Sequence, residues 1–429
     1  MADYSKETQN CPVPATLSLI TAESRSVAVP AQPQIVEIGS RRLKDIAHAG
    51  MRVTIAFTDA TRACPDAWLI NYLFRELGSL GILECDITLL CATGLHRPMT
   101  SSERIAKLGV DLAGRARIVD HRALDPEALI TVGEAAGLPI VVDRLCVETD
   151  LLIATGVVEP HQYAGYSGGA KTVVIGCGGE ATIQATHSAT MLDHPSTRLG
   201  NIDGNPFQQF VRAAGKLIGL DYVVNVILND AAEVLMAVAG EPAEVHNILV
   251  AQARGIYEVA VDRHAHIAMV GVPAPKAANL YQASRAATYL ALADHTPLLP
   301  GAPIILPAAI PEGAGQGTGE VRFYELLAGA VSPAALVEEL RRTGFPAGAQ
   351  RAYILAQVLI DHPVIIVGAQ HPDIVQACHM HAAEDMAQAL ALAESLARQH
   401  FGVDAPDVLN YLVVPDALLT LPHTPFPDL

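Results

Sequence analysis

Hydrophobic residues in the first half of the chain fall into short aliphatic runs separated by stretches with helical spacing. MRVTIAF (51–57) predicts a buried strand, and AWLINYLFRELGSL (67–80) predicts an amphipathic helix after it. CDITLLCAT (85–93) is a second aliphatic run, and SSERIAKLG (101–109) begins with Ser and then Glu, a capping pattern that predicts a helix start. Three further runs predict strands: RARIVDH, PIVVDR and DLLIATG. Continuous aliphatic runs are typical of strands buried on both faces of a largely parallel sheet.

The same alternation continues to the end of the chain. A glycine-rich stretch (164–179) precedes a predicted helix over 180–192, and YVVNVILND and EVLMAVAG predict two strands joined at Asn229-Asp230. We expect a long helix over 242–261 to lead into a second α/β unit, which begins with the strand HIAMVGV. Residues 1–40 carry scattered Pro and Val and predict an irregular arm with short strands.

The length of the chain sets the expected number of domains. The chain has 429 residues, and a single hydrophobic core rarely grows beyond ~250–300 residues. We therefore predict an α/β protein with an N-terminal domain over 1–260 and a C-terminal α/β domain over 261–402. We expect the last segment, about 403–429, to pack back on the N-terminal domain.

Composition and charge exclude several classes of protein. Hydrophobic residues make up 51% and charged residues 17%, which excludes general disorder. The formal net charge is −17 and no basic run offers a surface for nucleic acid. The seven cysteines are odd in number and none forms a C-x-x-C pair, which argues against a disulfide framework. Because we find neither a signal peptide nor a long uncharged apolar run, we expect a cytoplasmic protein without a membrane span.

Polar, reactive residues follow two of the predicted strands, and ligands of open α/β folds gather beyond the carboxyl ends of strands. Asp59-Ala60-Thr61-Arg62 follows the first strand, and its acid, hydroxyl and guanidinium could hold a ribose, a phosphate or a carboxylate. The alternative is a turn in which Asp59 caps a helix. His96, in GLHRPMT (94–100), is an acid/base candidate because an unperturbed imidazole has a pKa of ~6.5. The alternative is an ordinary loop histidine.

A third cluster, EPHQYAGYSGGAKT (159–172), contains His161 and Lys171. Its glycines would let backbone amides approach a ligand and form an anion nest. The end of this cluster resembles a Walker A loop, but Ala170 stands where that motif has Gly, and the preceding strand ends several residues early. His187, on the predicted helix 180–192, is a fourth candidate, although a lone helix histidine is usually a surface or core residue.

Together these clusters resemble the signature of the nickel-pincer lactate racemase family. That signature runs D-x-T-R, G-x-H-R-P-x-T, P-H-x-x-A-G-[FY]-S-G-G-x-K and a His-Ser on the following helix. Here the motifs are DATR (59–62), GLHRPMT (94–100), PHQYAGYSGGAK (160–171) and THS (186–188). A fifth segment, NLYQASR (279–285), resembles the family's substrate-binding helix. The five motifs share the order and spacing of the family.

The resemblance implies a covalently attached cofactor, nickel pyridinium-3,5-bisthiocarboxylic acid mononucleotide, bound to the N-terminal domain and made by separate biosynthetic enzymes. Lys171 would be the amine joined to the cofactor as a thioamide, and His187 would be the protein ligand of Ni(II). Three pincer donors and one imidazole give the square-planar arrangement that suits Ni(II). The residues that would contact the mononucleotide are Asp59, Ala60, Thr61 and Arg62, and Arg62 would also contact the substrate.

The resemblance also implies an isomerase that racemises or epimerises a 2-hydroxy acid by hydride transfer to the pyridinium ring. Such a reaction needs an acid/base group on either face of the substrate, and His96 and His161, on different loops, meet that need. Tyr281, Gln282 and Arg285 would bind the small-molecule substrate from the second domain, which implies an active site in an interdomain cleft.

One position departs from the lactate racemase pattern, because lactate racemase itself has Lys where this chain has Arg285. A guanidinium is planar and bidentate, whereas an ammonium is a point charge. We therefore predict that the chain prefers a 2-hydroxy acid other than lactate, such as a dicarboxylate or a sugar acid.

Other functions use some of the same residues. A nucleotide-binding phosphoryl-transfer protein would use Lys171 in a degenerate P-loop with Mg²⁺, and a cofactor-free binding protein on the same fold would have no use for Lys171 and His187. Cys378-His379-Met380-His381 and the pair His264/His266 lack a full set of metal ligands, and we interpret their histidines as surface residues. Cys177 has no identifiable His or Asp partner and is interpreted as a packing residue.

Overall fold

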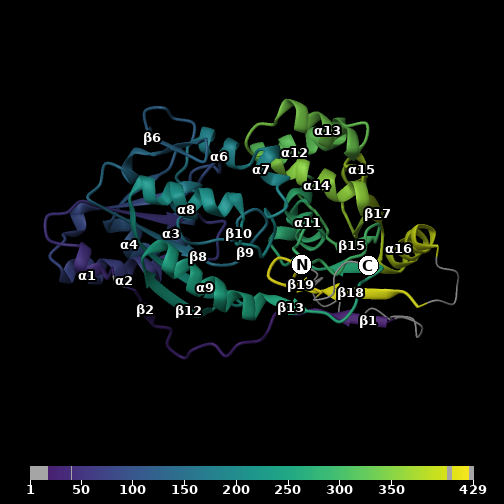
Figure 1. Ribbon diagram of the computed structural model, residues 1–429, viewed down its shortest axis with the longest axis horizontal. Helices are drawn as coiled ribbons and strands as arrows, with labels where there is room; N and C mark the ends of the chain where they lie inside the picture. Colours follow the sequence, from purple (N-terminus) through teal and green to yellow (C-terminus); the bar gives the residue numbers. More distant parts are fainter. Residues whose placement is uncertain (1–17, 40, 403–407, 425–429) are drawn as a thin grey trace.

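The computed structural model describes residues 18–39, 41–402 and 408–424. Within these residues, a seven-stranded sheet and a six-stranded sheet occupy the two ends of the long axis of the molecule, and helices pack on both (Figure 1). The sheets are parallel apart from one pair of strands, which confirms the predicted α/β fold with largely parallel sheets. Shorter ribbons pair β6 (Leu129–Ala135) with β7 (Leu138–Asp143), β9 (Pro160–His161) with β10 (Gly165–Tyr166), and β13 (Glu258–Ala260) with β19 (Leu421–His423).

The seven-stranded sheet carries the first half of the chain. In spatial order its strands are β2 (Ile35–Glu37), β12 (Val234–Gly240), β11 (Leu220–Leu228), β8 (Leu151–Val157), β3 (Val53–Thr58), β4 (Ile87–Ala92) and β5 (Arg117–Asp120). Only β11 and β12 run antiparallel among these described strands, which confirms the predicted pair joined at Asn229-Asp230. The carboxyl ends of β3, β4 and β8 therefore meet at one edge of the sheet.

Helices cover both faces of this sheet. Successive side chains of a strand point to opposite faces, and in β3 they are buried on both faces. Ile55 and Phe57 of β3 share one core with Leu69, whereas Ala56 belongs to a second core with Phe210. The helices of this half are α1 (Leu43–Ile46), α2 (Asp66–Ser79), α3 (Ser101–Leu108), α4 (Val110–Arg115), α5 (Lys171–Val174), α6 (Glu180–Thr186), α7 (Ala189–Leu192), α8 (Pro206–Ile218) and α9 (Pro242–Tyr257).

The six-stranded sheet is parallel throughout and carries most of the second half. Its strands in spatial order are β1 (Ser18–Thr21), β18 (Asn410–Val414), β14 (Ile267–Val270), β15 (Ile304–Pro307), β16 (Val364–Val367) and β17 (His381–Ala383). The helices around it are α10 (Leu280–Ala283), α11 (Arg285–Ala291), α12 (Thr318–Gly329), α13 (Pro333–Thr343), α14 (Gln350–Asp361), α15 (Pro372–Ala377) and α16 (Met386–Phe401). Among the described residues, no helix combines the length and apolarity needed to cross a membrane.

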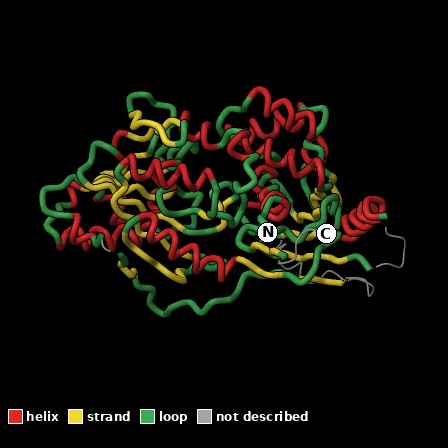
Figure 2. The backbone as a smooth tube through the Cα atoms, in the orientation of Figure 1, coloured by secondary structure: helices red, strands yellow, loops and turns green. Residues whose placement is uncertain are grey.

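β1, from the start of the described chain, and β18, from its last part, both join the second sheet, which differs from the expected division. β1 is the edge strand beside β18, and the connection from β1 to β2 runs along the molecule from one sheet to the other (Figures 1 and 2). β18 lies between β1 and β14, so this part of the segment 403–429 does not pack back on the first domain. β19 alone pairs with β13, at the end of the first half. A domain boundary near residue 260 stays a prediction.

Several helix boundaries differ from the pattern-based expectations. The helix expected over 180–192 is broken into α6 and α7 at His187, and the helix expected over 242–261 ends at Tyr257. The capping residue of α3 is Thr100, whose hydroxyl accepts from the Glu103 backbone N–H. The elements that the sequence pattern did not predict include α1, β6, α12, α15 and β17.

Candidate active site

Asp59 and His96 form a hydrogen-bonded pair where two neighbouring parallel strands end, after β3 and β4. His96 Nδ1 lies 2.6 Å from Asp59 Oδ2, and because a carboxylate only accepts, we assign the proton to Nδ1. The Thr61 hydroxyl donates to the other carboxylate oxygen over 2.6 Å. Burial raises the pKa of Asp59, but the hydrogen bonds from His96 and Thr61 and the charge of Arg62 outweigh it, so the net pKa is lowered. His96 is thus held by a carboxylate, with Nε2 left to accept a proton.

Arg62 is fixed through both its backbone and its side chain. Lys107 Nζ, from α3, donates to Arg62 O over 2.7 Å. Arg62 Nη1 lies 3.6 Å from Glu159 Oε1, at the start of the third sequence cluster. This contact brings the first and third clusters together, while Ala60, in the same loop, is exposed.

His161 ends β9, in a tight ribbon with β10. Two backbone N–H groups of the turn donate to His161 Nδ1 over 3.3 and 3.2 Å, so we assign the proton of the neutral ring to Nε2. Burial lowers the pKa of His161 well below its usual value, and the charges of Lys171 and Arg62 lower it further. His161 is therefore uncharged at neutral pH and presents a donor.

Lys171 is the first residue of α5. Burial lowers the pKa of Lys171 to about 7 and the nearby Arg62 guanidinium lowers it too, while Glu159 acts in the opposite direction. A lysine with this pKa is substantially an uncharged amine near neutral pH, which is the nucleophilic form.

The glycine-rich loop is held by protein contacts, which differs from the expected anion nest. The Gly169 N–H donates to Asn225 Oδ1 over 2.7 Å. Gly168 has a φ of 88°, and a Cβ there would lie 2.6 Å from a side-chain carbon. Thr172, which would bind Mg²⁺ in a P-loop, donates its hydroxyl to Thr155 O over 2.9 Å. These glycines serve the packing of the loop, and the geometry argues against the degenerate P-loop alternative.

His187 lies at the break between α6 and α7, as the residue that ends α6. Its Nδ1 lies 2.8 Å from Ile183 O, so Nδ1–H donates and Nε2 keeps its lone pair. Burial lowers the pKa of His187 to about 4. The rings of Tyr163 and Phe207 pack edge-on against the imidazole, with centroids 5.3 and 5.2 Å away. An anchored, neutral imidazole with a free Nε2 is suited to bind a metal ion.

Three of the four residues predicted to bind substrate, Tyr281, Gln282 and Arg285, lie on α10 and at the start of α11. Arg285 Nη1 lies 3.4 Å from Gln282 Oε1, and its Nη2 donates to Tyr289 OH over 2.8 Å. The Tyr281 ring packs edge-on against Phe323, with centroids 5.4 Å apart. Gln282 and Arg285 therefore share one side of this helical segment.

Arg351 of α14 joins these residues to the His161 ribbon. Its Nη1 donates to Gln162 Oε1 over 3.0 Å, and the Thr288 hydroxyl donates to the same oxygen over 3.3 Å. Its Nη2 lies 3.3 Å from Ser284 Oγ. Residues from both halves of the chain thus meet at one place. Arg351 was not predicted from the sequence, where its signal is a charged residue on the largely apolar buried side of α14.

The other reactive residues considered from the sequence have ordinary surroundings. Cys177 is fully buried, and burial raises the pKa of its thiol, which makes it unreactive. Cys378 is buried as well, and His379 Nε2 lies 3.0 Å from Leu327 O, a backbone carbonyl to which it donates. Neither neighbourhood adds a group to the site described above.

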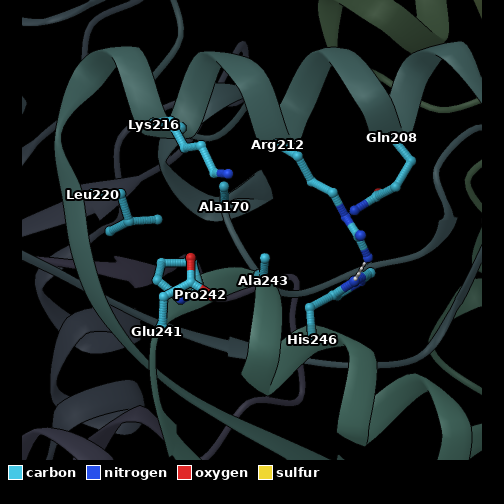
Figure 3. Close-up of a pocket in the computed structure, with 11 residues that line it drawn as sticks. Ala170, Gln208, Arg212, Lys216, Leu220, Glu241, Pro242, Ala243 and His246 are labelled. Atoms are coloured by element: carbon cyan, nitrogen blue, oxygen red, sulfur yellow. Dashed lines mark hydrogen bonds between the residues drawn. The ribbon is translucent and has the colours of Figure 1, made fainter. Parts of the chain in front are cut away.

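A separate small pocket, partly open to solvent, lies between α8 and α9 (Figure 3). Lys216 of α8 and Glu241 at the start of α9 line it. Arg212 Nη2 donates to His246 Nδ1 over 3.1 Å, and His246 Nε2 in turn donates to Ser167 O. The residues predicted to act on substrate or cofactor are absent from its described lining.

Comparisons with known proteins agree along most of the chain. The family model described as the lactate racemase N-terminal domain matches residues 4–200, and the model of the lactate racemase C-terminal domain matches residues 263–413. The lactate racemase of Lactiplantibacillus plantarum is 30% identical over 384 residues, which cover 88% of each chain. The lactate racemase of Thermoanaerobacterium thermosaccharolyticum is 29% identical over 387 residues, again 88% of each chain.

Solved structures give the same picture for the fold. The lactate racemase apoprotein from Thermoanaerobacterium thermosaccharolyticum superposes with a TM-score of 0.80 at 27% identity, and 90% of each chain is covered. A Thermotoga maritima protein superposes with a TM-score of 0.67 at 19% identity over 89% of this chain and 95% of its own, which shows a shared fold.

Proposed function

This chain belongs to the lactate racemase family, and from that premise we propose that it racemises or epimerises a 2-hydroxy acid at the site around His96 and His161. The observation that carries the proposal is the contrast between the partners of the two Nδ1 atoms, a carboxylate at His96 and backbone N–H groups at His161. With the tautomers assigned from these partners, His96 has a lone pair on Nε2, whereas His161 has Nε2–H. One ring can take the hydroxyl proton and the other can donate a hydrogen bond to the oxygen.

The two histidines act on the hydroxyl of the substrate. His96 Nε2 takes the hydroxyl proton, and the Asp59 carboxylate stabilises the imidazolium that results. The neutral His161 ring donates Nε2–H as a hydrogen bond to the substrate oxygen, because loss of its only ring proton would leave an imidazolate. The proton held by the His96 imidazolium returns to the oxygen when the substrate is restored in the opposite configuration, so both rings end as they began. Burial lowers the pKa of His161 and keeps the ring neutral in this role.

Two residues fit the nickel-pincer cofactor that the family resemblance implies. Lys171 has an amine that burial keeps largely uncharged near neutral pH, as covalent attachment requires, and His187 has a neutral ring with a free Nε2. When bound, the cofactor supplies a pyridinium ring that accepts the hydride from C2 and returns it. Tyr163 and Phe207 pack against His187 and fix the plane of its ring. The cofactor itself would come from separate biosynthetic enzymes.

Cationic and amide side chains from both halves of the chain would orient the substrate. Arg285 and Gln282 share one side of α10 and α11 and would hold the C1 carboxylate, with Arg62 facing it from the first half. Tyr281 would line the same space. The fork of Arg285, in place of a lysine, supports a preference for a 2-hydroxy acid other than lactate.

The test is a chiral assay of the protein from a host that makes the cofactor, after nickel content and intact mass confirm loading. His96→Gln and His161→Gln should each lower the rate in both directions by ~10²–10⁴-fold, because each turnover uses both rings. His48→Gln, a change at an exposed histidine, is the matched control and should leave the rate unchanged. A loaded native protein that racemises none of lactate, malate, phenyllactate, 2-hydroxybutyrate or gluconate would contradict the proposal.

A further inference from the structure

Arg351 is a buried cation that has only neutral partners. Its side chain is 5% exposed, yet it lies on α14 beside the residues proposed to bind substrate. Its four contacts are two hydroxyls, one side-chain amide oxygen and one backbone carbonyl, which belong to Thr288, Ser284, Gln162 and Tyr281. Its Nε is buried and has no hydrogen-bond partner among the described residues.

Arg285 is partly buried, and its partners are also uncharged, namely the Gln282 amide and the Tyr289 hydroxyl. Neither guanidinium has a carboxylate within 4.0 Å among the residues that the structure describes. This is unusual in a chain with 45 acidic residues, where other arginines of the same region are paired, as Arg341 is with Asp193 at 2.8 Å. Buried charges in proteins are normally paired, so two unpaired cations indicate that an anion is supplied from outside the chain.

Elsewhere in the site, Arg62 faces Glu159, and the Asp59 carboxylate is bonded to the His96 ring, which is assigned as neutral. The two guanidinium groups without a carboxylate partner are both on helices of the second half. They lie beside the substrate residues Tyr281 and Gln282, on the other half of the chain from Lys171. A substrate with a single carboxylate would neutralise one of these charges and leave the other uncompensated.

We propose that Arg285 and Arg351 form a subsite for two carboxylates, so that the substrate is a 2-hydroxy dicarboxylic acid. This inference rests on the proposed racemase function. Arg285, with Gln282, takes the C1 carboxylate next to the reacting carbon. Arg351 binds the second carboxylate. The donors are its Nε, which has no partner, and the side-chain amide of Gln162, which can turn from Arg351 towards the ligand. The guanidinium carbon of Arg351 lies 5.6 Å from the centroid of the Tyr281 ring, and this cation–π contact fixes the orientation of the guanidinium.

The experiment measures binding by calorimetry on the loaded protein at constant ionic strength, with two ligands that cannot react. Succinate has two carboxylates and no hydroxyl, and propionate has one carboxylate and no hydroxyl. The native protein should bind succinate about 10- to 100-fold more tightly than propionate, the ratio expected for one additional charge-assisted contact. Arg351→Met should bring this ratio close to one without weakening propionate, and Arg351→Lys should keep part of the preference.

Arg254→Met is the matched control, because Arg254 is paired with Glu258 away from the site, and it should keep the native ratio. Equal affinities for the two ligands in the native protein, or an unchanged preference in Arg351→Met, would overturn the subsite. If Arg351→Met does not fold, the native ratio and that of Arg351→Lys decide, because a purely structural arginine would leave both ligands equal.

The chiral assay separates this inference from the racemase function itself. Racemisation of lactate or another monocarboxylate without a succinate preference would overturn the dicarboxylate subsite alone. A succinate preference in a loaded protein that racemises no 2-hydroxy acid would overturn the racemase function.

Discussion

Lys171 shows how much one buried amine depends on the groups around it. The positive charge of Arg62 and the loss of water both favour the neutral amine, whereas Glu159 and Asp59 favour the ammonium ion. The balance puts the pKa of Lys171 at about 7, so its nucleophilicity changes across the physiological range.

We predict that Lys171 in the cofactor-free protein reacts with a trace of acetic anhydride at half its maximal rate near pH 7. Below that pH the rate should fall about tenfold per unit as the amine is protonated, while a model lysine titrates near ~10.4. Peptide mass spectrometry across pH 5–10 measures the profile. Arg62→Gln, which removes a nearby positive charge, should move the midpoint upwards, and a Lys171 rate that still climbs steeply between pH 9 and 10 would refute the prediction.

Single residues of the site were predictable only where a motif contains them. Asp59, His96, His161, Lys171 and His187 could be named from the sequence because their neighbours form recognisable patterns. Some partners could not be named, since the Ile183 carbonyl beside His187 is an ordinary backbone group. Arg351 was missed for a different reason, because its environment is assembled from segments that are distant along the chain. What each site residue does stays a prediction.

At the scale of secondary-structure elements, a buried ion pair joins α2 and α3 to the sheet. Asp66 at the start of α2 is fully buried and lies 2.9 Å from Lys107 Nζ of α3. The Asp66 carboxylate also accepts from the hydroxyls of Thr58 and Thr155, at β3 and β8. Lys107 in turn donates to Arg62 O, so this network also positions a residue of the site.

We predict that Asp66→Ala destabilises the protein by ~3–5 kcal/mol, because it leaves the Lys107 ammonium buried and unpaired. The midpoint of urea unfolding measures this loss. Asp66→Ala combined with Lys107→Met should recover part of it by removing the stranded charge. Asp150→Ala breaks an exposed pair with Arg52 and is the control, with little expected change. If the double variant loses as much stability as Asp66→Ala, the unpaired Lys107 ammonium is not the cause of the loss.

Elements were predicted well where the hydrophobic period is regular, as in β3 and α2, and less well where a polar residue interrupts it. The helical spacing of 180–192 continues through His187, but Ser188 has extended backbone angles and starts α7. Ser is a preferred first residue of a helix, and this signal was present in the sequence. The ribbon of β6 with β7 was missed because β7 is a continuous aliphatic run, like the strands of a parallel sheet, and only the structure shows its antiparallel partner.

At the scale of the whole molecule, Asp193 connects the His187 segment to the second half. This residue ends α7 and accepts from Tyr353 OH and Gln357 Nε2, both at 2.6 Å, and from Arg341 Nε at 2.8 Å. Burial raises the pKa of Asp193, but the three hydrogen bonds outweigh it and the net pKa is lowered. A lowered carboxyl pKa stabilises the fold above its unfolded value of ~3.9, and this contribution is lost as the pH falls through the folded value. The contact is therefore intact at neutral pH.

We predict that Asp193→Ala increases hydrogen exchange in α6, α7, α13 and α14 at pH 7, because the three donors lose their common acceptor. Exchange mass spectrometry should show the increase in peptides of these helices and no change in β3 and β4. Asp203→Ala, at an exposed carboxylate 3.7 Å from Arg254, should alter none of these peptides. Unchanged exchange in α13 and α14 of Asp193→Ala would show that other contacts carry the connection.

The position of β1 has a consequence for the order in which the molecule can be assembled during synthesis. Ser18–Thr21 pairs only with Asn410–Val414 among the described strands, so this segment has to wait for a partner that is synthesised much later. At ~5–20 residues per second this wait lasts ~20–80 s. During that time the strand has no neighbour, and the edge it will later cover is not yet made. The first sheet can form around α2 and α9 in this interval, but the second sheet is finished only after translation has passed Val414.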